Sequence, residues 1–333
     1  MLRTGFGDLA QTLQTRHQTA TIKAAAQRLG TEMTTGRPVD TPAALRGDLV
    51  PLAGIEAALS RLAGYGAVTA EAALFAEGMQ AALERVNDGA MAVSSLLLAS
   101  GSAAASAMIA PAAREATSAF EAAVAALNTR LGDRSLFAGV ATDGPALAPA
   151  RDILDAIALA AAAETTAAGV EAAVGAWFAD PAGFAAQFLG GAPRAPLLLS
   201  SEDTATLAVT ALDPALRDTL ASLALGALID RGTPPLPDAE RGALAQRAGE
   251  RLLAGQTARA ELQAAVGTQE GRIAAAARRN TAETAALEIA RAGLLSVDPA
   301  DTATRLQATQ TQLETLYAVT VRLSRLSLAD FLR

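Results

Sequence analysis

Apolar residues recur at helical spacing from the start of the chain. They lie three or four residues apart up to a break at Gly36 and Pro38, which predicts an amphipathic helix. Thr41 followed by Pro42 predicts the N-cap and first turn of the next helix. The members of this stripe are Leu2, Phe6, Leu9, Leu13, Ile22, Ala26, Leu29 and Met33.

The other end of the chain carries a second narrow stripe. From about Ala300 to Phe331 its apolar positions fall close to a heptad spacing, with Gln, Thr and Arg on the opposite face. A stripe this narrow needs a partner to form a stable helix, and the natural partner is the other terminus. We therefore expect a coiled coil of the two ends, whose C-terminal stripe comprises Leu306, Leu313, Leu316, Val319, Leu323 and Leu326.

Long helical patterns lie between the termini and the middle of the chain. The first runs from Ala43 to about Leu131, with kinks or breaks expected at Pro51, Gly64-Tyr65-Gly66 and Gly101. The second runs from Asp213 to Ile229, and the third is one long helix from Asp238 to about Arg291. The expected class is mainly α, built from long antiparallel helices.

The middle of the chain has a different pattern of residues. Ser135–Val140 predicts a strand or extended turn, and residues 150–189 predict Ala-rich helix. Leu197–Ser201 and Ala205–Leu212 predict two strands, which gives a small α+β insertion. We expect three domains: a terminal coiled coil (1–40 with 299–333), a helical rod (41–132 with 236–298) and an inserted module (133–235).

The composition restricts the chemistry. The 333 residues are 51% hydrophobic but only 3% aromatic, which suits closely packed Ala-rich helices. The chain has no Cys, so disulfides, thiolate metal sites and cysteine nucleophiles are excluded. His17 is the only histidine, and we expect it to be solvated or packed at a helix seam.

Net charge and hydropathy restrict the classes of partner that the chain could bind. A net charge of −7 argues against nucleic-acid binding. The charge-free run between Asp88 and Arg114 is long enough for a membrane span, but it is rich in Ser, Ala and Gly and contains Pro111, so packed helices are expected instead. The first 35 residues lack the apolar core of a signal peptide.

Motifs for catalysis are weak. Gly5–Ala10 has the GxGxxA spacing of a dinucleotide loop, but no strand pattern precedes it. Asp133 and Asp143 have the character of turn formers rather than metal ligands. The sequence thus predicts no enzyme, no catalytic residue, no cofactor and no metal.

Three segments resemble the bacterial flagellin superfamily, and more closely its hook–filament junction members, the hook-associated proteins of type 3. Leu29–Val39 (LGTEMTTGRPV) is similar to the end of the family's first helix. Leu313–Tyr317 (LETLY) and Leu323–Arg333 (LSRLSLADFLR) resemble its closing helix. Ser135–Asp143 (SLFAGVATD) resembles a turn common in the junction proteins.

The resemblance implies an extracellular structural protein of the flagellum. It would be exported unfolded without a cleaved signal peptide, with an export chaperone, and would self-associate and contact neighbouring axial proteins, namely another hook-associated protein and flagellin. Its terminal helices would be the assembly interface. The residues expected there are Phe6, Leu9, Leu13, Leu29, Leu306, Leu313, Leu316, Leu323, Leu326 and Phe331.

Two other functions are compatible with the pattern. A short flagellin, the filament subunit itself, would share the same terminal helices. A helical sensor or signalling rod would also use long Ala-rich antiparallel helices, but it should keep a membrane span or extended paired heptads.

Overall fold

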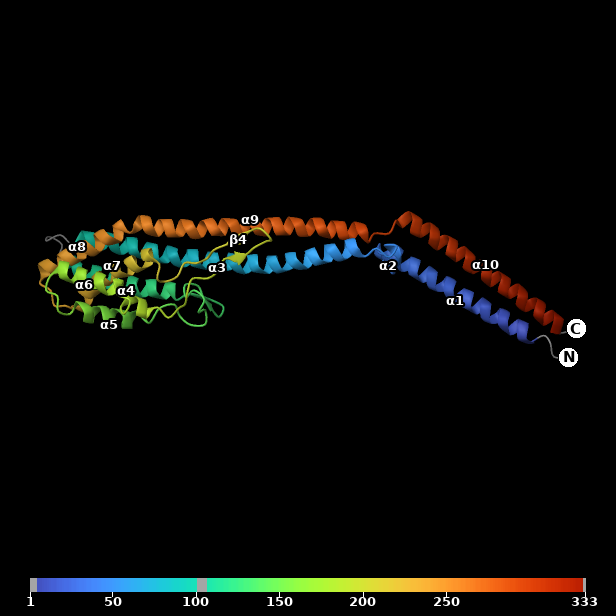
Figure 1. The fold of residues 1–333 in the computed structure, drawn as a ribbon, viewed down its shortest axis with the longest axis horizontal. Helices are drawn as coiled ribbons and strands as arrows, with labels where there is room; N and C mark the ends of the chain where they lie inside the picture. Colours follow the sequence, from blue (N-terminus) through green and yellow to red (C-terminus); the bar gives the residue numbers. More distant parts are fainter. Residues whose placement is uncertain (1–4, 101–106, 332–333) are drawn as a thin grey trace. The chain divides into compact units, whose positions relative to one another are not determined.

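The computed structural model describes residues 5–100 and 107–331, without the side chains of residues 5–9, 11, 12 and 323–331. The secondary structure is almost all helix, which confirms the predicted mainly α class (Figure 1). The long helices are α1 (Gly5–Thr35), α3 (Val50–Ser100), α9 (Gln256–Leu294) and α10 (Pro299–Phe331). The shorter ones are α2 (Thr41–Ala44), α4 (Ile109–Leu127), α5 (Ala150–Ala161), α6 (Ala167–Ala179), the 3-10 turn η2 (Phe184–Gln187), α7 (Pro214–Arg231) and α8 (Asp238–Ala254).

The chain divides into two compact units. Unit 1 comprises residues 1–61 and 282–333, and unit 2 comprises residues 62–281, so the boundary falls inside α3 and inside α9. The division into three domains stays a prediction.

Unit 2 is organised around α7. Asp213 caps the start of this helix through the backbone N–H of Ala215, and Gly232 ends it in the left-handed conformation that a C-cap requires. Every residue from Thr219 to Ile229 is buried. A helix that is apolar all round has to be covered all round. The helices α4, α5, α6 and α8 provide that cover.

Small residues set the distance between α4 and α7. A Cβ atom added at Gly226 would lie 2.5 Å from the Cβ of Ala116, far inside van der Waals contact. Ala112, Ala113, Ala116 and Ala123 of α4 are all buried, so the abundance of Ala in the sequence reflects this close packing.

The prediction of one long helix from Asp238 to about Arg291 is wrong, because α8 ends at Ala254 and α9 begins at Gln256. The buried guanidinium of Arg259 reaches back from α9 and donates to the carbonyl of Leu252 at 3.0 Å, which satisfies a backbone acceptor at the end of α8. A specific hydrogen bond from the Arg259 side chain therefore stabilises the end of α8 at this interruption.

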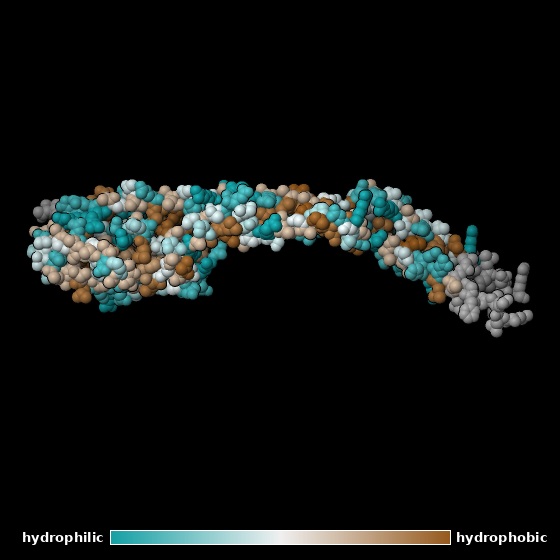
Figure 2. Space-filling model, in the orientation of Figure 1, coloured by the Kyte–Doolittle hydropathy of each residue, from teal (hydrophilic) through white to brown (hydrophobic). Residues whose placement is uncertain are grey.

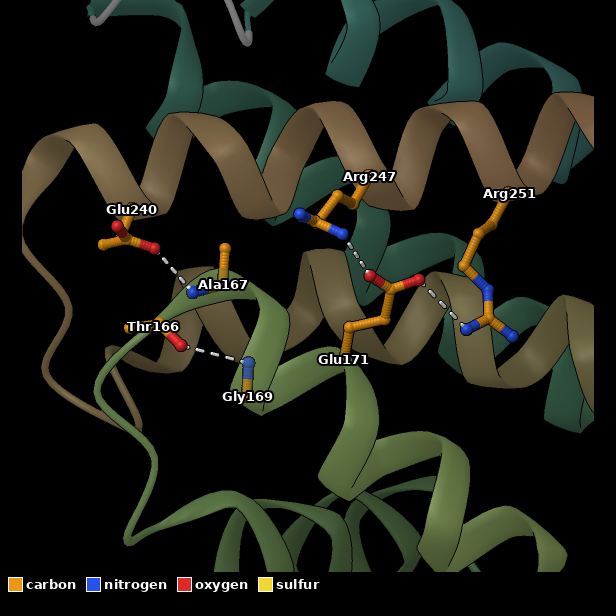
Figure 3. Close-up of polar contacts among 7 residues, drawn as sticks. All are labelled: Thr166, Ala167, Gly169, Glu171, Glu240, Arg247 and Arg251. Carbon is orange, nitrogen blue, oxygen red and sulfur yellow. Dashed lines mark hydrogen bonds and ion pairs between the residues drawn. The ribbon is translucent and has the colours of Figure 1, made fainter.

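Polar contacts fasten α6 to α8 (Figure 3). The hydroxyl of Thr166 accepts from the backbone N–H of Gly169, and the carboxylate of Glu240 on α8 accepts from the N–H of Ala167 at 2.6 Å. One turn further on, Arg247 and Arg251 project from α8 toward Glu171 on α6, and they pair with it at 2.8 and 3.4 Å. The N-terminus of α6 is thus capped partly from another helix.

The predicted strands are much shorter than expected. β3 (Leu197–Leu198) and β4 (Thr204–Ala205) form a hairpin of two residues per strand, not strands over 197–201 and 205–212. Side chains of α9 take up its remaining backbone groups: Asn280 donates to the carbonyl of Leu199, and Gln269 accepts from the N–H of Thr206. These side-chain bonds stand in for a longer ladder.

The segment Ser135–Val140 is a turn rather than a strand. Only Ser135 belongs to β2 (Arg134–Ser135), which pairs with β1 (Arg130–Leu131). At Gly139 φ is +61°, and an added Cβ would lie 2.3 Å from the carbonyl oxygen of Ala192. This turn therefore requires glycine for both reasons.

Two smaller expectations fail. The N-cap of α2 is Asp40, not Thr41, because the carboxylate of Asp40 reaches the N–H of Ala43. The helix α3 continues without a break through Gly64-Tyr65-Gly66, where intrahelical hydrogen bonds outweigh the glycine penalty.

The helix expected over residues 150–189 is present as α5, α6 and the 3-10 turn η2, with a turn between Ala161 and Ala167. The expected break at Gly101 lies outside the described residues.

Exposed apolar side chains on unit 2 are scattered. Examples are Leu74, Leu159 and Leu198, and the face of unit 2 shown in Figure 2 has apolar patches separated by polar surface. Within the described ranges, no helix has the length and apolar character needed to cross a membrane.

Candidate functional site

The helices α1 and α10 pair along a heptad seam in unit 1. They run side by side in opposite directions, so that α1 begins where α10 ends (Figure 1). The seam positions lie three and four residues apart on both helices, as in a coiled coil. The less exposed residues that form it are Thr15, Thr19, Ile22, Ala26 and Leu29 on α1, with Thr302, Leu306, Thr309, Leu313 and Leu316 on α10.

Threonines occupy much of this seam because their hydroxyls are satisfied within their own helix. Thr19 donates to the carbonyl of Thr15, Thr302 to that of Asp298, and Thr309 to that of Arg305, at 2.7 to 2.8 Å. Each hydroxyl is thereby removed from the seam and the methyl group can pack. The seam is weaker than a seam of Leu and Ile, because a methyl buries less apolar area.

Unit 1 has almost no core of its own. Among the residues of unit 1 whose side chains the structure describes, only Leu29 and Thr302 are buried. Several large apolar side chains of the pair stay in contact with water. These are Leu13 (63% exposed), Met33 (49%), Tyr317 (48%), Val319 (46%) and Val321 (52%).

A groove runs along one side of the pair. We call it the terminal groove; its volume is about 840 Å³, and Ile22 and Leu316 form part of its floor. His17 lines it and is exposed. The other lining residues are Gln18, Thr21, Ala308, Thr311, Gln312, Thr315 and Val319.

The two turns that lead into the pair are joined by a backbone hydrogen bond. The N–H of Val297, between α9 and α10, donates to the carbonyl of Gly36, between α1 and α2, at 3.1 Å. Gly36 has a φ of +68°, which favours glycine at this position. Asp298 then caps α10 through the N–H of Ala300 at 2.8 Å.

The ten predicted interface residues fall into three groups. Leu29 is buried, and Leu306, Leu313 and Leu316 are half-buried along the seam. Leu13 points away from it and is 63% exposed. The side chains of the remaining five lie outside the described residues: Phe6, Leu9, Leu323, Leu326 and Phe331.

Sequence reasoning missed the polar members of the surface. It passed over the seam threonines, although Thr302 and Thr309 share the heptad spacing of Leu306 and Leu313. It also passed over the groove around His17, which depends on how the two helices pack. The spacing of the threonines in the sequence could have placed them on the seam. No pattern in the sequence indicates the groove.

The other sites searched for in the sequence do not assemble. Gly5–Ala10 lies in α1, without a strand before it in the described part of the chain. No cluster of three or more His, Asp or Glu side chains that could hold a metal occurs among the described residues, Asp133 and Asp143 included.

Comparisons with known proteins agree with this architecture. Residues 255–332 match the family model of the bacterial flagellin C-terminal helical region. The fold is similar to that of a Vibrio parahaemolyticus protein assigned as a flagellar hook-associated protein, with a TM-score of 0.50 and 12% identity, over 73% of this chain and 95% of that chain. No curated protein matches the sequence significantly.

The family-model match over α9 and α10 supports a structural role in the bacterial flagellum. The match over α9 and α10 supports the flagellin superfamily for this part of the chain, and the solved structure shows that the fold is shared.

Proposed function

We propose that this protein joins the hook of the flagellum to its filament. The observation that carries the proposal is the coreless terminal pair: α1 and α10 bury only Leu29 and Thr302 among their described side chains and leave five large apolar residues in water. Such a pair gains most of its stability from packing against neighbours. Residues 255–332, which match the flagellin C-terminal region, include all of α10.

The assembly interface comprises the ten residues predicted from the sequence. Half-buried Leu306, Leu313 and Leu316 hold the seam, while exposed Leu13 contacts a neighbouring subunit directly. Phe6, Leu9, Leu323, Leu326 and Phe331 complete the proposed set. The neighbours are another hook-associated protein on one side and flagellin on the other.

Two observations favour a junction protein over a short flagellin, the alternative. The turn at Ser135–Asp143 resembles that of the junction proteins, and its Gly139 makes the close approach to Ala192 that holds the turn in place. The fold neighbour is itself assigned as a hook-associated protein.

Export is part of the proposal. The protein leaves the cell unfolded through the flagellar export channel, with its signal uncleaved and with a chaperone covering the C-terminal stripe until export. A chain without Cys has no disulfide to reduce before passage. The protein then acts outside the cell, as part of the flagellum.

Deletion of the gene in its host tests the proposal. Hooks without filaments, with unpolymerised flagellin shed into the medium, would support the junction role. Missing filaments with no flagellin in the medium or on the cell would instead make this protein the filament subunit. In a host with related copies, the assay requires a strain that lacks all of them, complemented by this chain; failure to restore filaments or swimming would contradict both roles.

A further inference from the structure

The terminal pair has two different flanks. With about 100° per residue around a helix, Gln312, Thr315 and Val319 lie on one side of the α10 seam, in the terminal groove. Glu314, Tyr317 and Val321 lie on the other side. Together with Gln310 they form a stripe at three- and four-residue spacing, which we call the terminal ridge.

The terminal groove is almost free of ionisable groups. His17 is the one titratable side chain among its lining residues, and α10 contributes none to it. Arg16 and Lys23, the charged neighbours of His17 on α1, lie on the ridge side of that helix by the same geometry. Among the described side chains of the isolated subunit, no carboxylate therefore lies beside His17 in the terminal groove.

The terminal ridge has the complementary character. Tyr317 and Val321 are 48% and 52% exposed and lie four residues apart, so they form one apolar edge. Glu314 lies one turn before them and is exposed. It takes part in no ion pair in the described part of the chain.

We propose that the terminal ridge of a second copy of this chain docks into the terminal groove, with Glu314 of the second copy facing His17. The inference rests on the proposed assembly role and specifies the contact between neighbouring copies in that assembly. His17 lines the groove beside Thr315, Leu316 and Val319, so it stands at the level of residues 314–317 of a copy running in the same direction. The apolar edge then covers Val319 and the groove floor.

Because groove and ridge are different surfaces, the contact is heterologous. Each docked copy presents its own groove or ridge to the next one, so the contact repeats around an axis instead of closing in a dimer. An axial assembly requires this geometry.

The pairing of His17 with a carboxylate makes docking sensitive to protons. Histidine gains its charge between about pH 8 and pH 5, and a facing carboxylate favours the charged form. Docking is therefore strengthened as the pH falls through this range and weakened as it rises. Glu314 is the carboxylate on the incoming ridge, with Tyr317 beside it. Arg16 and Lys23 lie on the α1 side of the same ridge and are the cations that Glu314 has to outweigh at His17.

Sedimentation velocity of the full chain over a concentration series tests the pairing. We expect wild-type self-association to be about three- to fivefold tighter at pH 5.5 than at pH 8. His17→Gln and Glu314→Gln should each remove this difference, while the control Glu288→Gln on α9 should keep it. Equal pH dependence in His17→Gln and wild type, or a wild type that stays monomeric at both pH values, would overturn the inference.

Cross-linking tests the docking itself, and the absence of natural Cys makes it specific. Val319→Cys (groove) and Val321→Cys (ridge), which lie at nearly the same level in the docked copies, are mixed and oxidised at constant pH. We expect the mixed dimer to exceed either homodimer, and Glu288→Cys with Val321→Cys to give none above background. Homodimers in excess would refute the groove–ridge contact, yet the deletion phenotype would still support the junction role.

Discussion

The guanidinium of Arg259 donates to the side-chain oxygen of Asn87 at 3.1 Å and so ties α9 to α3 across 172 residues of sequence. Arg259 is only 3% exposed, and its other partners are the carbonyl of Leu252, the sulfur of Met91 and, at 3.5 Å, the hydroxyl of Thr219. No carboxylate pairs with it among the described residues. Burial alone lowers its pKa.

Arg259→Lys should therefore destabilise unit 2. A lysine ammonium cannot reach Asn87 and Leu252 together, so at least one buried acceptor loses its partner, at a cost of about 2 kcal/mol. Urea denaturation measures the change in the free energy of unfolding. The exposed Arg278→Lys on the same helix is the control and should be neutral; equal stability of the two variants would refute the buried polar role.

Leu313→Asp should abolish assembly and leave unit 2 folded. The substitution places a charge on the half-buried seam of the terminal pair, far in sequence from the core of unit 2. Complementation of the deletion strain and the thermal unfolding of the purified protein are the two measurements. Thr304→Asp, on an exposed position of the same helix, should assemble normally, and normal assembly by Leu313→Asp would remove the seam from the interface.

Gly226→Ala should destabilise the protein even though alanine is the better helix former. The new Cβ would lie 2.5 Å from that of Ala116, so α4 and α7 must separate, at a cost of about 1–3 kcal/mol. Gly175→Ala on α6 is the matched control, because nothing lies within 4 Å of its Cβ position. That variant should gain up to about 1 kcal/mol. If both variants shifted the denaturant midpoint in the same direction, the packing argument would be contradicted.

The carboxyl group of Asp203 should titrate below its ordinary pKa of 3.8. The hydrogen bond from Arg279, then that from Ser200, lowers the pKa of this group. The contribution of the contact to stability is present above the ordinary pKa and is lost as the pH falls through the lowered one. A ¹³C titration of the Asp203 carboxyl measures the midpoint, which should move up toward 3.8 in Arg279→Gln and stay in place in Arg272→Gln.

Much of the fold was predictable because its main signals are periodic. The stripes through Leu29 and Leu313 identify the two terminal helices, and Asp213 with Gly232 brackets α7. The breaks were harder to place. The helix is interrupted at Gly255, where Arg259 donates to the carbonyl of Leu252, while Gly64 and Gly66 interrupt nothing, and local sequence does not separate these cases.

The functional surface was predictable to a lesser degree. Spacing alone finds Leu306, Leu313 and Leu316, which lie on the seam. It misplaces Leu13 relative to that seam, because the α1 heptad passes through Thr15 and Thr19 instead. The terminal groove depends on the packing of two helices almost 300 residues apart, and no local pattern encodes it.

On the export route proposed above, the burial of α7 on every side would set an order of folding for a chain delivered N-terminus first. The cover of α7 comes from α4, α5 and α6, which precede it, and from α8 and Arg259 of α9, which follow it. Until Arg259 has emerged, α7 would lack part of its cover and unit 2 could not finish folding. Folding of unit 2 would then be completed only after about three quarters of the polypeptide is outside, so an incompletely delivered subunit would stay immature.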